Sequence, residues 1–295
     1  MMQVEECYYK SAKSVQLYGK IYMPEGVMNA IVIMVHGIGE HSRCYDEWAE
    51  KFVSQSIGFL AFDLRGHGHS PGIRGHATFR LIKDDLRTII KSVRDRFPSI
   101  HIILFGHSMG GSIALNYAIE KDVDVQGVIA SSPWLKLVHP PTPLLVWIAR
   151  WASYLVPWLT VSTGIKADQL SHDGMGTRSS KTDPLLHKKI SIKLFIDLWK
   201  NSKIMLHNKH RLNIPLLLMH GTADQLTSYQ ATESFAQNAE GNITFREWHE
   251  MRHDLLNDAG NEAVFQYVMN WLSNQIIKKS KNGTIQNSSQ LQIFA

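Results

Sequence analysis

The sequence has little cysteine, no long apolar run and no strong excess of charge. Its 295 residues include only two cysteines, Cys7 and Cys44, and neither lies in the spacing of a disulfide framework or a metal site. We therefore expect a protein of a reducing compartment such as the cytoplasm. No stretch of about 18 apolar residues predicts a transmembrane helix, and the N-terminal residues do not resemble a signal peptide. The net charge of +5 is too small to indicate nucleic acid as a partner.

The chain does contain a regular alternation of apolar strands and amphipathic helices. Its length suits one large α/β domain with room for an inserted segment. Helical periodicity occurs at residues 46–55, 81–97, 190–207 and 262–276. Strand patterns occur at residues 4–9, 15–23, 30–35, 57–62, 102–105, 125–131, 214–219 and 244–248. This order predicts a mostly parallel, eight-stranded sheet flanked by helices.

One serine stands at the apex of a sharp turn between a strand and a helix. The turn, Gly106-His107-Ser108-Met109-Gly110, follows the buried strand at 102–105. A Cβ atom at position 106 or 110 would collide with the strand or the helix, which explains the two glycines. Such a turn holds the Ser108 hydroxyl above the carboxyl edge of the sheet. The pattern predicts the nucleophile elbow of an α/β-hydrolase fold. The alternative is a glycine-rich turn with an ordinary serine.

A second glycine-containing loop, His36-Gly37-Ile38-Gly39-Glu40, follows the strand at 30–35. Its glycines let the backbone turn sharply and approach a ligand closely. In a hydrolase, the backbone N–H groups of Ile38 and Met109 would form the oxyanion hole. The alternative is a simple strand-to-helix connection.

Two further residues complete a triad in the order Ser108, Asp224, His253, which is the chain order of this fold. Asp224 lies on a glycine-containing loop just past the strand at 214–219, and its alternative role is to cap the next helix. Two histidines compete for the third position. His249 stands at a strand end, whereas His253 lies in the loop that can reach back to the elbow, so we predict His253.

The loop at 63–72 is dense in glycine and histidine and could suggest a metal site. Its spacing fits no helix-borne zinc pattern, and no cysteine or nearby carboxylate completes one. We favour a structural loop in which Asp63 and Arg65 hold the turn. We expect no metal and no cofactor.

Strict alternation stops between residues 134 and 210, where we predict a helical cap inserted into a core formed by residues 1–133 and 211–277. Trp134, Trp147 and Trp151 belong to this segment, and the last two share a helical face with Tyr154, Leu155 and Trp158. That face either packs on the core or forms an apolar lid that contacts substrate and a lipid surface. We favour the lid. Residues 278–295 are polar and predicted to be poorly ordered.

Taken together, several motifs resemble the monoacylglycerol lipase and lysophospholipase group of α/β-hydrolases, over residues 10–276. They are the segments 36–42, 106–111, 183–185 and 220–224, together with His253. The resemblance implies hydrolysis of a single acyl ester of an amphiphile and places Glu40 near a glycerol head group. Two positions depart from the group. Cys44 stands where an arginine is usual, with Arg43 one place early, and Leu256 replaces a polar histidine.

We therefore predict a serine esterase or lipase that removes one acyl chain from a small lipid, such as a monoacylglycerol or a lysophospholipid, through an acyl-enzyme. Trp134, Trp147 and Trp151 are expected to contact the substrate, and the cap to contact a membrane surface. The alternatives are a short-chain carboxylesterase of broad specificity and a non-catalytic ligand receptor on the same scaffold. Head group, chain length and oligomeric state stay open.

Overall fold

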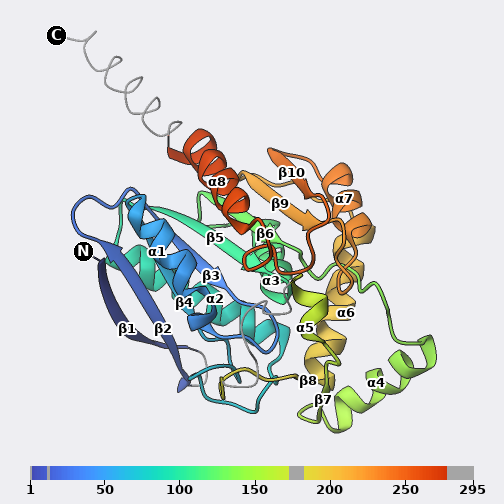
Figure 1. The fold of residues 1–295 in the computed structure, drawn as a ribbon. Coiled ribbons are helices and arrows are strands. Elements are labelled where there is room, and N and C mark those ends of the chain that lie inside the picture. The colour runs from blue at the N-terminus through green and yellow to red at the C-terminus, as the bar shows by residue number, and fades with distance from the viewer. Residues whose placement is uncertain (1, 12–13, 173–182, 278–295) are drawn as a thin grey trace, which may run out of the picture.

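One twisted sheet forms the centre of the molecule in the computed structural model, which describes residues 2–11, 14–172 and 183–277 (Figure 1). The tail at 278–295 lies outside the described residues. The sheet order is β1-β2-β4-β3-β5-β6-β9-β10. Pairing is antiparallel only for β1 with β2 and for β2 with β4, and parallel elsewhere. The predicted eight-stranded, mostly parallel sheet is confirmed. Its strands are β1 (Met2–Lys10), β2 (Gln16–Pro24), β3 (Ala30–Val35), β4 (Ile57–Phe62), β5 (His101–His107), β6 (Gly127–Ser131), β9 (Leu216–Gly221) and β10 (Ile243–Trp248).

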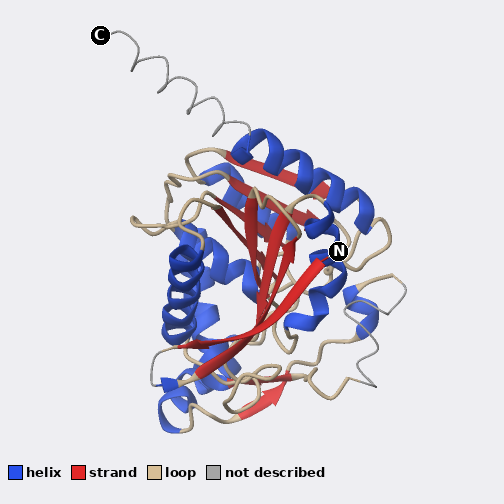
Figure 2. Cartoon of the chain, turned by 90° about the vertical axis from the view of Figure 1, so that its left-hand side faces the viewer, coloured by secondary structure: helices blue, strands red, loops and turns tan. Residues whose placement is uncertain are grey.

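Both faces of the sheet are covered, which is why its central strands are continuous apolar runs (Figure 2). Side chains alternate along β3: Ile31 and Ile33 pack into one core cluster, and Val32 and Met34 into the other. Helices α2 (Phe79–Arg96), α3 (Met109–Ala118) and α7 (Tyr229–Asn238) contribute to the first cluster. Helices α1 (Asp46–Ser54) and α8 (Asn261–Leu272) contribute to the second. A short 3-10 helix (Ser42–Tyr45) precedes α1, and a π-helical turn (Ser273–Ile277) follows α8.

An insertion joins β6 to β9. It contains α4 (Pro143–Leu155), β7 (Thr160–Ser162), α5 (Ala167–Leu170), β8 (Lys189–Ser191) and α6 (Ile192–His207). The antiparallel β7–β8 ribbon was not predicted, because three-residue strands are too short to show a period. Helix α4 ends two residues before Pro157, because a residue that precedes proline disfavours helical geometry. Trp158 therefore lies beyond the helix. Helix α6 packs Leu194 and Leu198 into the same core cluster as α2 and α7.

The parallel arrangement brings the loops after β3, β5, β6, β9 and β10 to one edge of the sheet. These loops carry the residues that the sequence analysis selected. Among the described residues, no helix combines the length and the apolar character needed to cross a membrane.

Candidate active site

Ser108 occupies the turn between β5 and α3 with a backbone φ of 56° and ψ of −116°. This strained conformation is rare for a residue with a side chain. A Cβ atom on Gly106 would lie 2.2 Å from the Gly110 carbonyl oxygen, and one on Gly110 would lie 1.9 Å from the Val35 carbonyl oxygen. Only glycine fits at either position. The turn is further fixed by a 2.9 Å hydrogen bond from the Ser108 N–H to the Ser131 carbonyl.

The Ser108 hydroxyl meets the imidazole of His253, which lies in the loop between β10 and α8. Nε2 of His253 is 2.9 Å from Oγ of Ser108, and its Nδ1 is 2.7 Å from Oδ2 of Asp224. All three side chains are buried, whereas His249 is exposed. The structure thus brings together Ser108, Asp224 and His253 in hydrogen-bonding order. Such a chain of contacts can activate a hydroxyl as a nucleophile.

Several groups besides His253 contact the Asp224 carboxylate. Its Oδ1 accepts the N–H groups of Leu226 and Thr227 at 2.7 and 3.0 Å, and its Oδ2 accepts the Thr227 hydroxyl at 2.8 Å. Nε2 of His220 lies 2.9 Å from Oδ2. Burial alone would raise the pKa of Asp224, but His253 and His220 beside it hold that pKa far below its usual value. Asp224 is therefore an anion in the folded protein.

The protonation of His253 follows from the same contacts. Burial acts to lower the pKa of its imidazole, but the neighbouring Asp224 carboxylate outweighs burial and raises the pKa. His220 was not among the predicted site residues, although it is the penultimate residue of β9 and lies four residues before Asp224. That spacing is the signal that could have found it.

The two expected oxyanion donors lie directly after Ser108 and in the loop after β3. Met109 is the first residue of α3, so its N–H has no partner within the helix. Ile38 lies in the loop after β3 and lines the same cavity as Ser108 and His253. Gly39 has a φ of +79°, which turns the loop sharply after Ile38.

Glu40, expected near a glycerol head group, is engaged within its own loop. Its Oε2 accepts the Gly37 N–H at 2.7 Å and the Tyr45 hydroxyl at 2.5 Å, and it is not among the residues that line the cavity. The side chain is only 7% exposed. Through these two contacts, the Glu40 carboxylate stabilises the backbone of its own loop.

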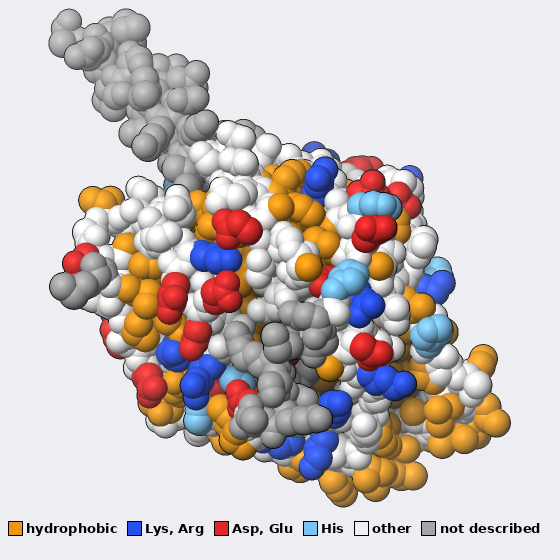
Figure 3. Space-filling model, viewed as in Figure 1, with side chains coloured by type: hydrophobic (Ala, Val, Ile, Leu, Met, Phe, Trp, Pro, Cys, Tyr) orange, Lys and Arg blue, Asp and Glu red, His pale blue; other side chains and the backbone are white. Residues whose placement is uncertain are grey.

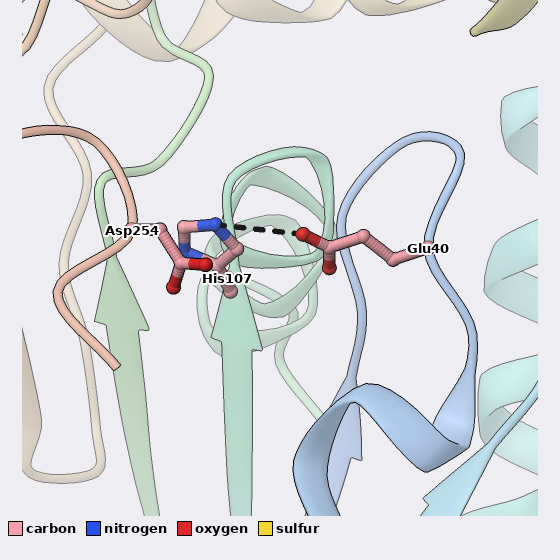
Figure 4. A group of neighbouring side chains, drawn as sticks. All are labelled: Glu40, His107 and Asp254. Carbon is pink, nitrogen blue, oxygen red and sulfur yellow. Dashed lines mark ion pairs between the residues drawn. The ribbon is translucent and has the colours of Figure 1, made fainter. Parts of the chain in front are cut away.

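Glu40 also belongs to a buried cluster with His107 and Asp254 (Figure 4). Their potential ligand atoms all lie within 4.8 Å of one another, and Nε2 of His107 is 3.9 Å from Oε1 of Glu40. Each member stands next to, or two positions from, a residue of the site: Ser108, His253 or Ile38. The His107 ring also lies 5.0 Å from the His253 ring, centroid to centroid. The cluster therefore places negative charge behind the imidazole of His253.

A cavity of about 600 Å³ is lined by Ser108 and His253 and by mostly apolar side chains. Its size is that of a small-molecule site. The wall includes Trp134, as the sequence analysis expects of a substrate-contacting residue, and Phe195 of α6. Helix α4 contributes Leu145, Val146, Ile148, Ala149 and Ala152.

Trp147 and Trp151 lie elsewhere. Each is 59% exposed and neither lines the cavity, so the structure does not bring them to the substrate position. Their face does not pack on the core either. Helix α4 is apolar apart from Arg150, Ser153 and the Tyr154 hydroxyl, and side chains such as Val146, Ala149 and Ala152 line the cavity. Periodicity identified which residues share a face, but not which face points inward.

The exposed side of α4 is part of a large apolar surface. Orange side chains gather at the lower right of Figure 3, where Figure 1 places α4. The exposed residues of this surface, which we call the α4 patch, are Leu144, Trp147, Ile148, Trp151, Tyr154, Leu155, Trp158, Leu159 and Val161. Contiguous apolar surface of this kind marks an interaction site on a soluble domain.

The loop at 63–72 has structural contacts. Asp63 accepts the N–H of Ser42 and of His69, both at 2.6 Å, and Arg65 pairs with the buried Asp85. These contacts support the expected role of Asp63 and Arg65 in holding the turn.

Comparisons with known proteins agree with this architecture. A family model described as Hydrolase_4, serine aminopeptidase S33, matches residues 26–260. An uncharacterized abhydrolase domain-containing protein of Dictyostelium discoideum is 31% identical over 86% of this chain, and the chain spans 27% of that protein's length. A monoacylglycerol lipase of Mycolicibacterium smegmatis is 26% identical over 88% of this chain and 93% of its own. Among solved structures, a monoacylglycerol lipase of Paleococcus ferrophilus is similar with a TM-score of 0.77 and 29% identity, covering 87% of this chain and 98% of its own.

Proposed function

The chain belongs to the Hydrolase_4, serine aminopeptidase S33, family of α/β-hydrolases, and we propose that it is a carboxylic ester hydrolase that removes one acyl chain from an amphiphilic lipid. A monoacylglycerol or a lysophospholipid is the proposed substrate class. The observation that carries the proposal is the Ser108–His253–Asp224 contact chain in the wall of a mostly apolar cavity. The relatives named as monoacylglycerol lipases support the same chemistry.

In the proposed mechanism, Ser108 attacks the ester carbonyl while His253 takes its proton. Asp224 orients the imidazole and stabilises its charged form. The N–H groups of Ile38 and Met109 stabilise the oxyanion, each lowering the barrier by about 3 kcal/mol. His253 then gives the proton to the leaving alcohol, and the resulting acyl-enzyme is hydrolysed by a water that His253 activates.

The walls of the cavity support an acyl chain as the bound group. Leu145, Val146 and Phe195 offer dispersion contacts and no charge, which suits a hydrocarbon and not a charged peptide terminus. Glu40 is engaged with Tyr45 and Gly37, so we do not retain its contact with a glycerol head group.

The α4 patch supports contact with a lipid surface. The same helix lines the cavity with one face and exposes Trp147 and Trp151 with another. Indole rings favour the interface between water and lipid. Docking through this helix would bring a membrane-borne lipid next to the cavity. A cytoplasmic location, expected from the cysteine content, stays a prediction.

The substrate class is tested by comparing hydrolysis of 1-monoacylglycerol with that of 1-acyl-lysophosphatidylcholine over short to long chains. Preference for long chains in either series supports the lipid proposal, and the better series identifies the head group. Activity confined to short, water-soluble esters would support the broad carboxylesterase instead.

A further inference from the structure

A short segment of the insertion, which precedes β8, lies against the loop that carries Ile38. We call residues 183–187 the return segment and residues 36–42 the oxyanion loop. The His187 N–H donates a hydrogen bond to the Gly39 carbonyl at 3.0 Å. In addition, Nε2 of His41 lies 3.0 Å from Oδ2 of Asp183. Two contacts, one between backbones and one between side chains, therefore join segments about 140 residues apart in the sequence.

The backbone contact leaves no room for a side chain at Gly39. A Cβ atom there would lie 2.0 Å from the His187 carbonyl oxygen, and the φ of +79° already favours glycine. The return segment thus packs directly on the backbone of the residue that follows Ile38.

The side-chain contact has a defined chemistry. Oδ1 of Asp183 accepts the Leu185 N–H at 2.9 Å, which leaves Oδ2 for His41. Burial acts to raise the pKa of Asp183, but the Leu185 N–H and His41 outweigh it and lower the pKa. The carboxylate is therefore ionised and accepts, so Nε2 of the fully buried His41 carries the proton.

Other contacts hold the oxyanion loop to the core. The Ser42 N–H donates to Asp63 at 2.6 Å, and Nε2 of His187 lies 3.2 Å from the Gly66 carbonyl. The second contact joins the return segment to the loop at 63–72, so these two segments contact each other as well as the oxyanion loop. The contact with Asp63 anchors the end of the oxyanion loop at Ser42. Next to Ile38, the Glu40 carboxylate holds the Gly37 N–H on one side, and the return segment holds the Gly39 carbonyl on the other.

We propose that Asp183 and His41 are positioning residues that hold the Ile38 N–H in the oxyanion hole. The inference rests on the proposed function and gives the Asp183-Pro184-Leu185 motif a role in catalysis that needs no substrate contact. Because an oxyanion donor acts only in the transition state, its displacement lowers kcat and leaves substrate binding unchanged.

The test compares Asp183→Ala, Asp183→Asn and His41→Gln with Asp122→Asn, which removes an exposed carboxylate elsewhere. We expect Asp183→Ala to lower kcat about 10- to 100-fold, with KM within about twofold of the wild type. The loss should be partial because a displaced Ile38 N–H still stabilises the oxyanion to some extent. Asp183→Asn keeps one oxygen for the Leu185 N–H but presents an NH₂ donor to His41, which must then accept through an unprotonated Nε2. This variant should retain more of kcat than Asp183→Ala. The control should match the wild type.

A second readout isolates the oxyanion. An acyl trifluoromethyl ketone forms a tetrahedral oxyanion on a serine, whereas an ether analogue of the ester binds without reaction. Asp183→Ala and His41→Gln should weaken the ketone and not the ether. Unchanged kcat in folded variants, or equal loss of both ligands, would overturn the inference. A wild-type protein that hydrolyses no ester would instead contradict the proposed function, which a failure confined to the variants leaves intact.

Discussion

Nε2 of His220 lies 2.9 Å from Oδ2 of Asp224, the oxygen that also contacts Nδ1 of His253 at 2.7 Å. The same Nε2 lies 3.1 Å from the Thr227 carbonyl, and Nδ1 of His220 lies 2.9 Å from the Thr232 hydroxyl. Two acceptors around Nε2 require that this nitrogen carry the proton. A second histidine therefore donates to the carboxylate that orients the proposed base.

His220→Leu should lower kcat about 10- to 100-fold, because a hydrogen bond to a charged group contributes about 1.5–3 kcal/mol. KM should change little, since His220 does not line the cavity. Steady-state kinetics on the preferred ester measure the effect, with the exposed His207→Asn as control. Equal kcat in His220→Leu and the control would contradict a role for His220 at Asp224.

The pH dependence should follow the raised pKa of His253. The base must be neutral, so kcat/KM should fall as pH decreases through this pKa, with a midpoint above the usual histidine value. Asp224 raises this pKa most, and Asp254 and Glu40 add smaller contributions. Glu40→Gln should therefore move the midpoint to lower pH by less than about one unit. Glu50→Gln, at an exposed position, serves as the control, and an unmoved midpoint in Glu40→Gln would argue against the cluster's influence.

The buried pair of Arg65 and Asp85 should contribute to stability and not to chemistry. Asp85→Ala leaves the guanidinium of Arg65 without this carboxylate and should lower the free energy of unfolding by about 3–5 kcal/mol. The adjacent Asp84→Ala removes only surface ion pairs and should cost about 1 kcal/mol or less. Denaturant unfolding measures both variants. A similar loss of unfolding free energy in Asp85→Ala and Asp84→Ala would mean that the buried pair stabilises the fold no more than a surface ion pair does.

The α4 patch should bind lipid surfaces. Replacing both Trp147 and Trp151 by serine should reduce co-sedimentation with phosphatidylcholine vesicles several-fold, since each indole buries large apolar area. Hydrolysis of a short, water-soluble ester should be unchanged, because neither ring lines the cavity. Val27→Ser, which removes an exposed apolar side chain elsewhere, should bind vesicles like the wild type. Full vesicle binding by the double variant would exclude this surface.

Much of the architecture could be predicted from the sequence because the central strands are apolar runs and most of them are followed by glycine-containing loops. Ser108, Asp224 and His253 could be selected because parallel strands end at one edge, so position along the chain implied proximity. The role of Glu40 could not be predicted, because a sequence motif does not show that Tyr45 and Gly37 donate hydrogen bonds to its carboxylate. The orientation of α4 could not be predicted either, because apolar side chains surround most of this helix and its few polar residues do not mark which side faces the cavity.

The most direct test of the central claim is hydrolysis of a long-chain 1-monoacylglycerol and of 1-acyl-lysophosphatidylcholine by the wild type and by Ser108→Ala. Circular dichroism and thermal unfolding confirm that the variant is folded. We expect the wild type to cleave at least one of these esters, and Ser108→Ala to lower kcat by about 10⁴-fold or more while remaining folded. A folded Ser108→Ala variant that keeps the wild-type rate would contradict Ser108 as the nucleophile and, with it, the proposed mechanism.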